Sequence, residues 1–264
     1  QTQRNLHGGP QKRRLFLMSY KLSEKIIGRL ANHYIDRKPT LNFLHVGKTA
    51  GTVVLEAGIG FRQLKTSEGF RLRDKIHWKY RTTVIGHEKV PYSLSKPNLA
   101  FFIREPISRL ESAFWYEKNW NKSEYARIYQ QPKRTAEYYA QFSSFTEWAA
   151  ALTDGEHKKH DSAMKLKALG YHLGRDYSFY FRNEKTVDSI RENILFIGET
   201  EYYTSDIQRL CGIIGIKNHS LLLNRRNISD KPQSDKPSPE LRNELQSHLK
   251  QEYLIYNKLK RIKL

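Results

Sequence analysis

The chain has 264 residues, and its 46 Lys and Arg against 27 Asp and Glu give a formal net charge of +19. Hydrophobic residues make up 38 %, which is enough to build the core of one large α/β domain or two small ones. This excess of positive charge indicates an anionic partner: nucleic acid, an anionic membrane surface, an acidic polysaccharide or a multiply charged nucleotide. Charge alone does not choose among them.

The chain holds a single cysteine, Cys211, so an intramolecular disulfide is excluded and a reducing cytosol is the simpler expectation. No apolar run approaches the ~18 residues of a membrane span, and no signal peptide is visible. We therefore expect a cytoplasmic protein of bacterial type. Because the chain begins at Gln1, a protein of the Golgi lumen whose N-terminal anchor has been removed is the alternative.

Residues 1–38 are expected to form an N-terminal tail followed by a helix. Leu15, Met18, Leu22, Ile26 and Leu30 recur near helical spacing within residues 11–38. The first half of that helix is basic. It is expected to pack on the domain, and contact with a membrane surface is the alternative.

Residues 39–264 are expected to form one α/β domain. Its predicted buried strands are the short apolar runs "LNFLHV", "TTVIGH", "LAFFIR" and "ILFIGE". Helical stretches separate most of them, which predicts a mostly parallel sheet flanked by helices. Near the end, Ser238-Pro239-Glu240 predicts a helix start, with Ser as the cap and Pro at the first position. An apolar stripe from Leu241 to Leu259 predicts one long helix after it.

The stretch "FLHVGKTAGT", residues 43–52, reads as a strand that enters a phosphate-binding turn. Gly47 permits a tight turn, and the backbone N–H groups from Lys48 to Thr52 would then point into one concavity at a helix N-terminus. A nucleotide loop of the Walker type needs a glycine five residues before the Gly-Lys pair, and Asn42 stands there. The turn is therefore expected to hold a phosphate end-on.

A second motif, "LAFFIREPISRLESAF", is a strand that ends in Arg104. A Walker-type site usually ends its second strand in an aspartate that helps hold magnesium. Here a cation takes that place, and Arg109 and Ser112 follow on a predicted helix that begins near Pro106. The two motifs predict a ligand with phosphates at two places and no metal between them. Arg109 is either part of the second phosphate site or structural.

The two motifs together resemble those of the sulfotransferases that use 3′-phosphoadenosine 5′-phosphosulfate (PAPS). The likeness is closest to the carbohydrate branch, which includes the heparan sulfate 2-O-sulfotransferases and bacterial relatives. "VIGHEKVPYSL" resembles the Gly-His segment of that branch, and "ILFIGETEYYTSDIQRL", "NISDKP" and "YLIYNKL" resemble its later strand, loop and final helix. The resemblance extends from about residue 40 to residue 260.

The resemblance implies a P-loop-like sheet and transfer of the sulfonate of PAPS to a hydroxyl of a carbohydrate, either a polysaccharide or a glycolipid. The other product is adenosine 3′,5′-bisphosphate, and no metal is expected. Lys48 would stabilise the leaving phosphate, His87 would be the general base, and Glu88 is next in line as base. The expected cofactor-binding residues are Gly47, Lys48, Thr49, Ala50, Gly51, Thr52, Arg104, Ser112, Arg225 and Lys231.

Residues 114–182 are expected to form a helical, aromatic-rich insertion on the acceptor side. Nearly half of the aromatic residues lie between Trp115 and Phe181. Aromatic faces stack on sugar rings, and basic neighbours suit an acidic glycan. Packing within the core of the insertion explains many of these residues equally well, and the two interpretations are compatible.

Two other functions remain open at this point. A metal-dependent nucleotide kinase would use Glu199 as the acidic end of its strand. A non-catalytic module would bind acidic glycan or nucleic acid through its charge. For the sulfotransferase we expect a carbohydrate partner, acidic or neutral, and no nucleic acid.

Overall fold

The computed structural model describes residues 37–49, 79–85, 88–90, 98–120, 135–216, 232 and 235–263. The tail and helix predicted for residues 1–38 lie almost wholly outside these ranges.

A parallel sheet of four strands lies at the centre of the described structure. The strands are β1 (Thr40–Leu44), β2 (Arg81–Ile85), β3 (Leu99–Ile103) and β4 (Ile194–Glu199), in the order β2-β1-β3-β4. All three strand pairs are parallel. The predicted strands and the predicted α/β class with a parallel sheet are confirmed. All five residues of β3 are buried, as expected for a strand covered on both faces.

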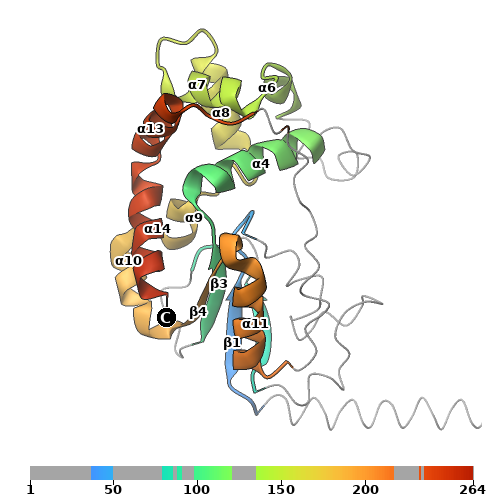
Figure 1. Ribbon diagram of the computed structural model, residues 1–264, viewed down its shortest axis with the longest axis vertical. Coiled ribbons are helices and arrows are strands. Elements are labelled where there is room, and N and C mark those ends of the chain that lie inside the picture. The colour runs from blue at the N-terminus through green and yellow to red at the C-terminus, as the bar shows by residue number, and fades with distance from the viewer. Residues whose placement is uncertain are drawn as a thin grey trace, which may run out of the picture.

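Helices cover both faces of the sheet (Figure 1). One face packs on α11 (Tyr203–Ile214), and its core includes Phe43, Phe102 and Phe196. Gly198 is needed at this face, because a Cβ there would lie 2.3 Å from the Phe102 ring. The other face packs on α9 (Tyr177–Phe181), α10 (Glu184–Ser189) and α14 (Lys250–Ile262).

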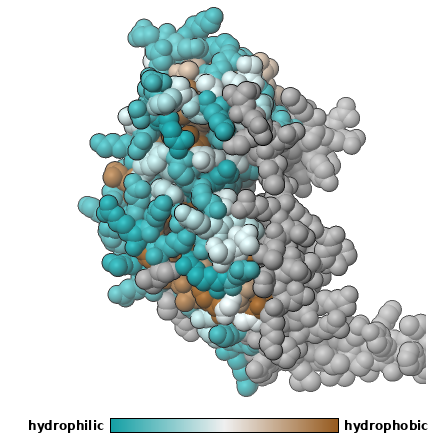
Figure 2. Space-filling view, viewed as in Figure 1, coloured by the Kyte–Doolittle hydropathy of each residue, from teal (hydrophilic) through white to brown (hydrophobic). Residues whose placement is uncertain are grey.

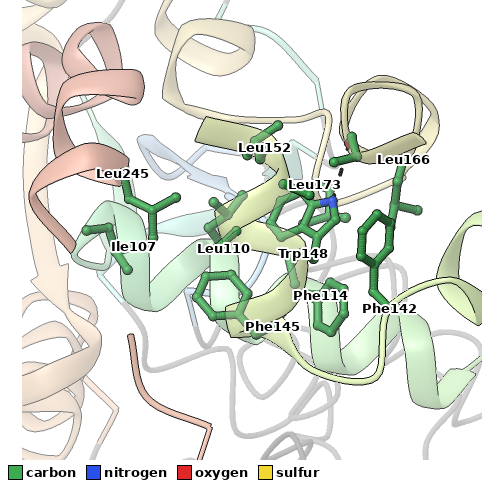
Figure 3. Close-up of a cluster of buried hydrophobic side chains, with 14 of the residues drawn as sticks. Ile107, Leu110, Phe114, Phe142, Phe145, Trp148, Leu152, Leu166, Leu173 and Leu245 are labelled. Carbon is green, nitrogen blue, oxygen red and sulfur yellow. Dashed lines mark hydrogen bonds between the residues drawn. The ribbon is translucent and has the colours of Figure 1, made fainter. Parts of the chain in front are cut away.

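A second, wholly helical core lies beyond the sheet. It contains α4 (Pro106–Trp120), α6 (Ala136–Ala140), α7 (Phe145–Thr153), α8 (His160–Leu169) and α13 (Pro239–His248). Figure 3 shows its centre, where Phe114 stacks on Trp148 with 5.5 Å between ring centroids. The Trp148 indole N–H donates to the Ala163 carbonyl over 3.3 Å. Many aromatic residues of the predicted insertion therefore serve this core.

The predicted insertion, residues 114–182, does not pack as a single piece. Its helices α6, α7 and α8 belong to the helical core, but α9 packs against the sheet. Two short 3₁₀ turns flank β4, Arg191–Asn193 before it and Thr200–Tyr202 after it. Because α9 packs against the sheet, residues of this helix reach the edge of the sheet where the predicted site lies.

The C-terminal helix begins where the sequence predicts. The Ser238 hydroxyl accepts the Leu241 N–H over 3.2 Å, and Pro239 is the first residue of α13. The prediction of one long helix is wrong, because the helix breaks at Leu249 and α14 begins at Lys250. Neither Pro nor Gly marks this break. Leu249 itself is buried in the helical core, while α14 packs against the sheet, so the break lies where the chain passes from one core to the other.

The described face in Figure 2 is mostly hydrophilic. Among the described residues, no helix combines the length and the apolar character that a membrane span requires.

Candidate active site

The two predicted phosphate motifs meet at the carboxyl edge of the sheet. β1 and β3 are neighbours, with Leu44 paired to Phe101. Lys48 follows the end of β1, and Arg104 follows Ile103 directly at the end of β3. Ligands of open parallel sheets bind outside the carboxyl ends of the strands. The fold therefore brings both motifs to the edge where such a ligand binds.

The turn at residues 47–49 has its unusual backbone at Lys48. Lys48 has φ 65°, in the left-handed region that few residues other than glycine adopt. The sequence led us to expect that Gly47 supplies the freedom for this turn, and in the structure Lys48 adopts the left-handed conformation instead. The Thr49 hydroxyl stabilises the turn by donating to the Val46 carbonyl over 2.8 Å. A strained non-glycine residue of this kind is typical of functional sites.

The Lys48 ammonium is largely removed from water. Its Nζ lies 3.6 Å from the centroid of the Tyr116 ring. Burial lowers the pKa of Lys48 from 10.5 to about 7; Arg104 lowers it further, and Glu117 opposes the shift. Over the described ranges, no carboxylate forms an ion pair with this ammonium. Lys48 is therefore a partly buried cation with an unfavourable neighbour, Arg104.

Arg104 is the second cation of the site. Burial lowers its pKa, while Glu201 and Glu111 oppose the shift. Its positive charge also lowers the pKa of Lys48, as repulsion between two cations does. Two partly buried cations at the ends of adjacent strands favour an anion between them, because the anion reduces both the repulsion and the loss of hydration.

Tyrosine hydroxyls from α9 hold both motifs in place. The Gly47 N–H donates to the Tyr180 hydroxyl over 2.9 Å. The Arg104 N–H donates to the Tyr177 oxygen over 2.8 Å, and the Tyr177 hydroxyl donates back to the Arg104 carbonyl over 2.7 Å. Tyr177 and Tyr180 are one helical turn apart and therefore lie on the same side of α9.

Sequence reasoning missed these tyrosines. The available signal was the pair of tyrosines at i and i+3 in "YSFYF", since a buried tyrosine hydroxyl needs a partner. The tyrosine that holds Gly47 is 133 residues away in the chain, so nothing local predicts the contact.

Arg109 is structural, which decides between its two predicted roles. Its side chain is fully buried and its Nη2 lies 3.0 Å from the Glu252 carboxylate on α14. Its Nη1 donates to the carbonyls of His172 and Arg175 over 3.4 and 3.1 Å. Arg109 thus joins α4, α14 and the segment between α8 and α9.

Ser112 lies on the turn of α4 that faces the site. It is buried, and Tyr116, which contacts Lys48, follows it by four residues on the same face of the helix. The next residue, Glu117, accepts backbone N–H groups from Tyr171, His172 and Leu173 over 3.0, 2.5 and 3.1 Å. Burial outweighs these bonds and raises the pKa of Glu117. Glu117 fixes the segment before α9 to the helix that carries Ser112.

The candidate base and several cofactor residues lie outside the described residues. These are His87, Ala50, Gly51, Thr52, Arg225 and Lys231. The chain on either side of His87 is described. The Ile85 carbonyl accepts the His45 N–H over 2.9 Å, and the Val90 N–H donates to the Tyr180 carbonyl over 2.9 Å. Glu88, the alternative base, is exposed.

Glu199 is occupied by lysines. It is buried at the end of β4, with Lys263 at 2.9 Å from one carboxylate oxygen and Lys260 at 3.6 Å from the other. The kinase alternative needs this carboxylate for magnesium. Its ion pairs give Glu199 a structural role in anchoring the end of α14.

Comparisons with models of protein families, with curated proteins and with solved structures found no match.

Proposed function

We propose that the protein is a sulfotransferase that moves the sulfonate of PAPS to a hydroxyl of a carbohydrate, on a sheet that is P-loop-like in its use of the turn after β1. One observation carries the proposal. Lys48 and Arg104 are partly buried cations that follow adjacent parallel strands and repel each other. In a magnesium-dependent site an acidic residue would stand at the end of the second strand.

The residues present fit PAPS, an anion with phosphates at two places. Lys48 would hold the 5′-phosphosulfate, with the backbone N–H of Thr49 and the rest of the turn to Thr52 as further donors. Arg104 would hold the 3′-phosphate, and Ser112, on the face of α4 turned toward the site, would donate to it. When bound, PAPS supplies the sulfonate and a phosphate leaving group. Because Arg104 replaces the acidic residue, no metal is needed to bridge the two ends.

Lys48 would stabilise the charge that develops on the leaving phosphate oxygen as the sulfur–oxygen bond breaks. A second sulfur–oxygen bond forms to the acceptor hydroxyl, whose proton is taken up by a base, for which His87 is our candidate and Glu88 the alternative. Binding an anion beside Lys48 raises its pKa again, so the group is charged when it is needed.

The remaining expectations belong to this proposal. Arg225 and Lys231 would close over the 3′-phosphate or reach an acidic acceptor. Residues 39–264 would form the transferase domain. A cytoplasmic location rests on the single, buried thiol of Cys211 and the absence of a predicted disulfide.

A ligand pair that differs by one phosphate tests the proposal. We expect adenosine 3′,5′-bisphosphate to bind in EDTA much more tightly than adenosine 5′-monophosphate, which lacks the 3′-phosphate, and more tightly than Mg-ATP. Arg104→Ala should weaken binding of the bisphosphate by about 1.5–3 kcal/mol, the range for a charged hydrogen bond, and leave binding of the monophosphate nearly unchanged. Arg191→Ala, at an exposed arginine in the turn before β4, is the control. A preference for Mg-ATP in calorimetry would disprove the sulfotransferase assignment.

A further inference from the structure

A cationic and aromatic surface lies beside the candidate site, which we call the Arg175 shelf: Tyr171, Arg175, Phe179 and Lys89. The Arg175 guanidinium lies 3.9 Å from the Tyr171 ring centroid and 5.2 Å from that of Phe179. The Lys89 ammonium lies 5.9 Å from the Phe179 centroid. Two positive charges therefore share one aromatic ring.

Hydrogen bonds to its backbone hold the shelf in place. The Arg175 carbonyl accepts from buried Arg109 over 3.1 Å, and the Tyr171 N–H donates to buried Glu117 over 3.0 Å. The Asp176 carboxylate caps α9 by accepting the Phe179 N–H over 3.0 Å. Tyr171, Arg175 and Phe179 are thus fixed through their backbones, so the Arg175 side chain starts from a defined position.

The charge of Arg175 is not used within the described structure. In the described ranges its guanidinium forms no ion pair and donates no hydrogen bond. The adjacent carboxylate, Asp176, caps α9 and lies 4.0 Å from Lys167 instead. A guanidinium that is stacked on an aromatic ring keeps its N–H edge for a carboxylate or a sulfate, which it can bind with two parallel hydrogen bonds.

Contacts connect the shelf to Gly47 and Lys48 of the phosphate turn. On one side Phe179 packs against Tyr180, with 5.2 Å between centroids, and the Tyr180 hydroxyl accepts the Gly47 N–H.

On the other side the contacts run through aromatic rings to Lys48. They join Tyr171 to His172 at 4.9 Å, His172 to Tyr116 at 5.3 Å, and Tyr116 to the Lys48 ammonium at 3.6 Å. The shelf is therefore linked by three successive contacts to the lysine beside which the sulfonate would be transferred.

We propose that the Arg175 shelf is the acceptor subsite and that it binds an anionic group, a carboxylate or a sulfate, on the acceptor sugar or the sugar next to it. This inference rests on the proposed function and narrows it to acidic carbohydrates. Arg175 is the residue that determines the specificity for an anionic group, and the ammonium of Lys89 adds to the positive electrostatic potential of the shelf. The Phe179 ring, which is only partly buried, offers an apolar surface to the sugar ring.

Paired acceptors separate the anionic group from the rest of the sugar. The probes are hexasaccharides of hyaluronan, chondroitin and polygalacturonate, each beside its carboxyl-reduced, neutral counterpart. Binding is measured by calorimetry with saturating adenosine 3′,5′-bisphosphate. Wild type should bind at least one acidic hexasaccharide tenfold or more tighter than its neutral counterpart. Arg175→Gln should remove about tenfold to hundredfold of that affinity, the usual worth of a charged hydrogen bond.

Matched variants exclude an effect of net charge. Arg191→Gln removes the same charge at an exposed arginine away from the shelf and should keep the preference. Arg175→Lys keeps the charge without the planar donor edge and should lose part of it. If no acidic hexasaccharide is preferred, or if Arg175→Gln and Arg191→Gln weaken binding equally, the proposal is overturned.

The same titrations keep the two proposals apart. Arg175→Gln should leave the affinity for adenosine 3′,5′-bisphosphate unchanged, which also reports that this variant is folded. Wild type that binds the bisphosphate but shows no preference for acidic sugars would overturn the shelf alone. Wild type that fails to bind the bisphosphate would overturn the proposed function.

Discussion

Replacing Lys48 by methionine should make the protein more stable and inactive. Burial and the neighbouring Arg104 lower the pKa of Lys48 from 10.5 to about 7. At 1.36 kcal/mol per pKa unit, holding this lysine protonated in the folded state costs about 5 kcal/mol at pH 6. Contact of the ammonium with Tyr116 returns about 1–2 kcal/mol of this. Methionine fills similar space and packs well on an aromatic ring, so Lys48→Met should raise the free energy of unfolding by about 3 kcal/mol.

The pH dependence gives this prediction its signature. The folded pKa lies below the unfolded one, so between about pH 7 and pH 10.5 the unfolded chain binds more protons and wild-type stability rises with pH. The penalty is complete below pH 7 and is lost as the pH approaches 10.5. Lys48→Met lacks this contribution. At pH 9 the folded wild-type lysine is neutral and still costs about 2 kcal/mol, so the advantage of Lys48→Met should be about 1 kcal/mol smaller at pH 9 than at pH 6.

Urea unfolding of both proteins at pH 6 and pH 9 is the measurement. Lys165→Met, at an exposed lysine on α8, is the matched control and should stay within about 0.5 kcal/mol of wild type at both pH values. The reasoning is refuted if Lys48→Met is no more stable than wild type at pH 6, or if its advantage is the same at both pH values. Sulfonate transfer should be lost in Lys48→Met and kept in Lys165→Met.

Three further predictions follow from the same contacts. Binding of adenosine 3′,5′-bisphosphate at pH 8 should be accompanied by the uptake of nearly one proton, because the anion raises the pKa of Lys48 from about 7. Calorimetry in two buffers of different ionisation enthalpy measures this uptake, and an uptake of zero would contradict the prediction. For the same reason the affinity for the bisphosphate should fall as the pH rises from 7 to 9. Arg109→Met should lower the free energy of unfolding, measured in urea, by about 3 kcal/mol or more, because buried Glu252 then keeps only its longer contact to Lys167. A decrease below about 1 kcal/mol would argue against the structural role of Arg109. Tyr177→Phe leaves the Arg104 N–H and carbonyl without their partner, so it should lower the free energy of unfolding by about 1–3 kcal/mol and weaken binding of the bisphosphate. A variant with unchanged stability and affinity would show that the hydrogen bonds of Tyr177 to Arg104 are dispensable.

The sheet could be predicted because its signals are local. Each strand is a short apolar run that ends at polar or glycine residues, and the helices between the runs make a parallel sheet the natural arrangement. The N-terminus of α13 followed from Ser238 and Pro239, since a cap depends on residues within one turn. The break at Leu249 has no such local sign and depends on how two cores divide the chain between them.

The candidate site was only partly readable for the same reason. Lys48 and Arg104 stood out, because phosphate chemistry demands cations at strand ends. The role of Arg109 stayed open until its partner Glu252 was known, 143 residues away. Tyr177, Tyr180 and the Arg175 shelf belong to a segment whose aromatic residues are hard to assign from sequence, where some fill the core and others support the site.

The arrangement around Lys48 favours an anion-binding role over a purely structural one. A structural lysine gains from an ion pair or from exposure to water, whereas Lys48 is desolvated, has a left-handed backbone and is repelled by Arg104. Each of these features lowers the stability of the free protein. The α9 tyrosines hold the two motifs in this costly arrangement by hydrogen bonds to backbone groups, which leaves both cationic side chains available. An anion between the two cations would replace their repulsion by attraction and restore the charge on Lys48. Relief of this strain in the free protein would therefore strengthen anion binding, and the charged Lys48 would stabilise the negative charge that develops during transfer.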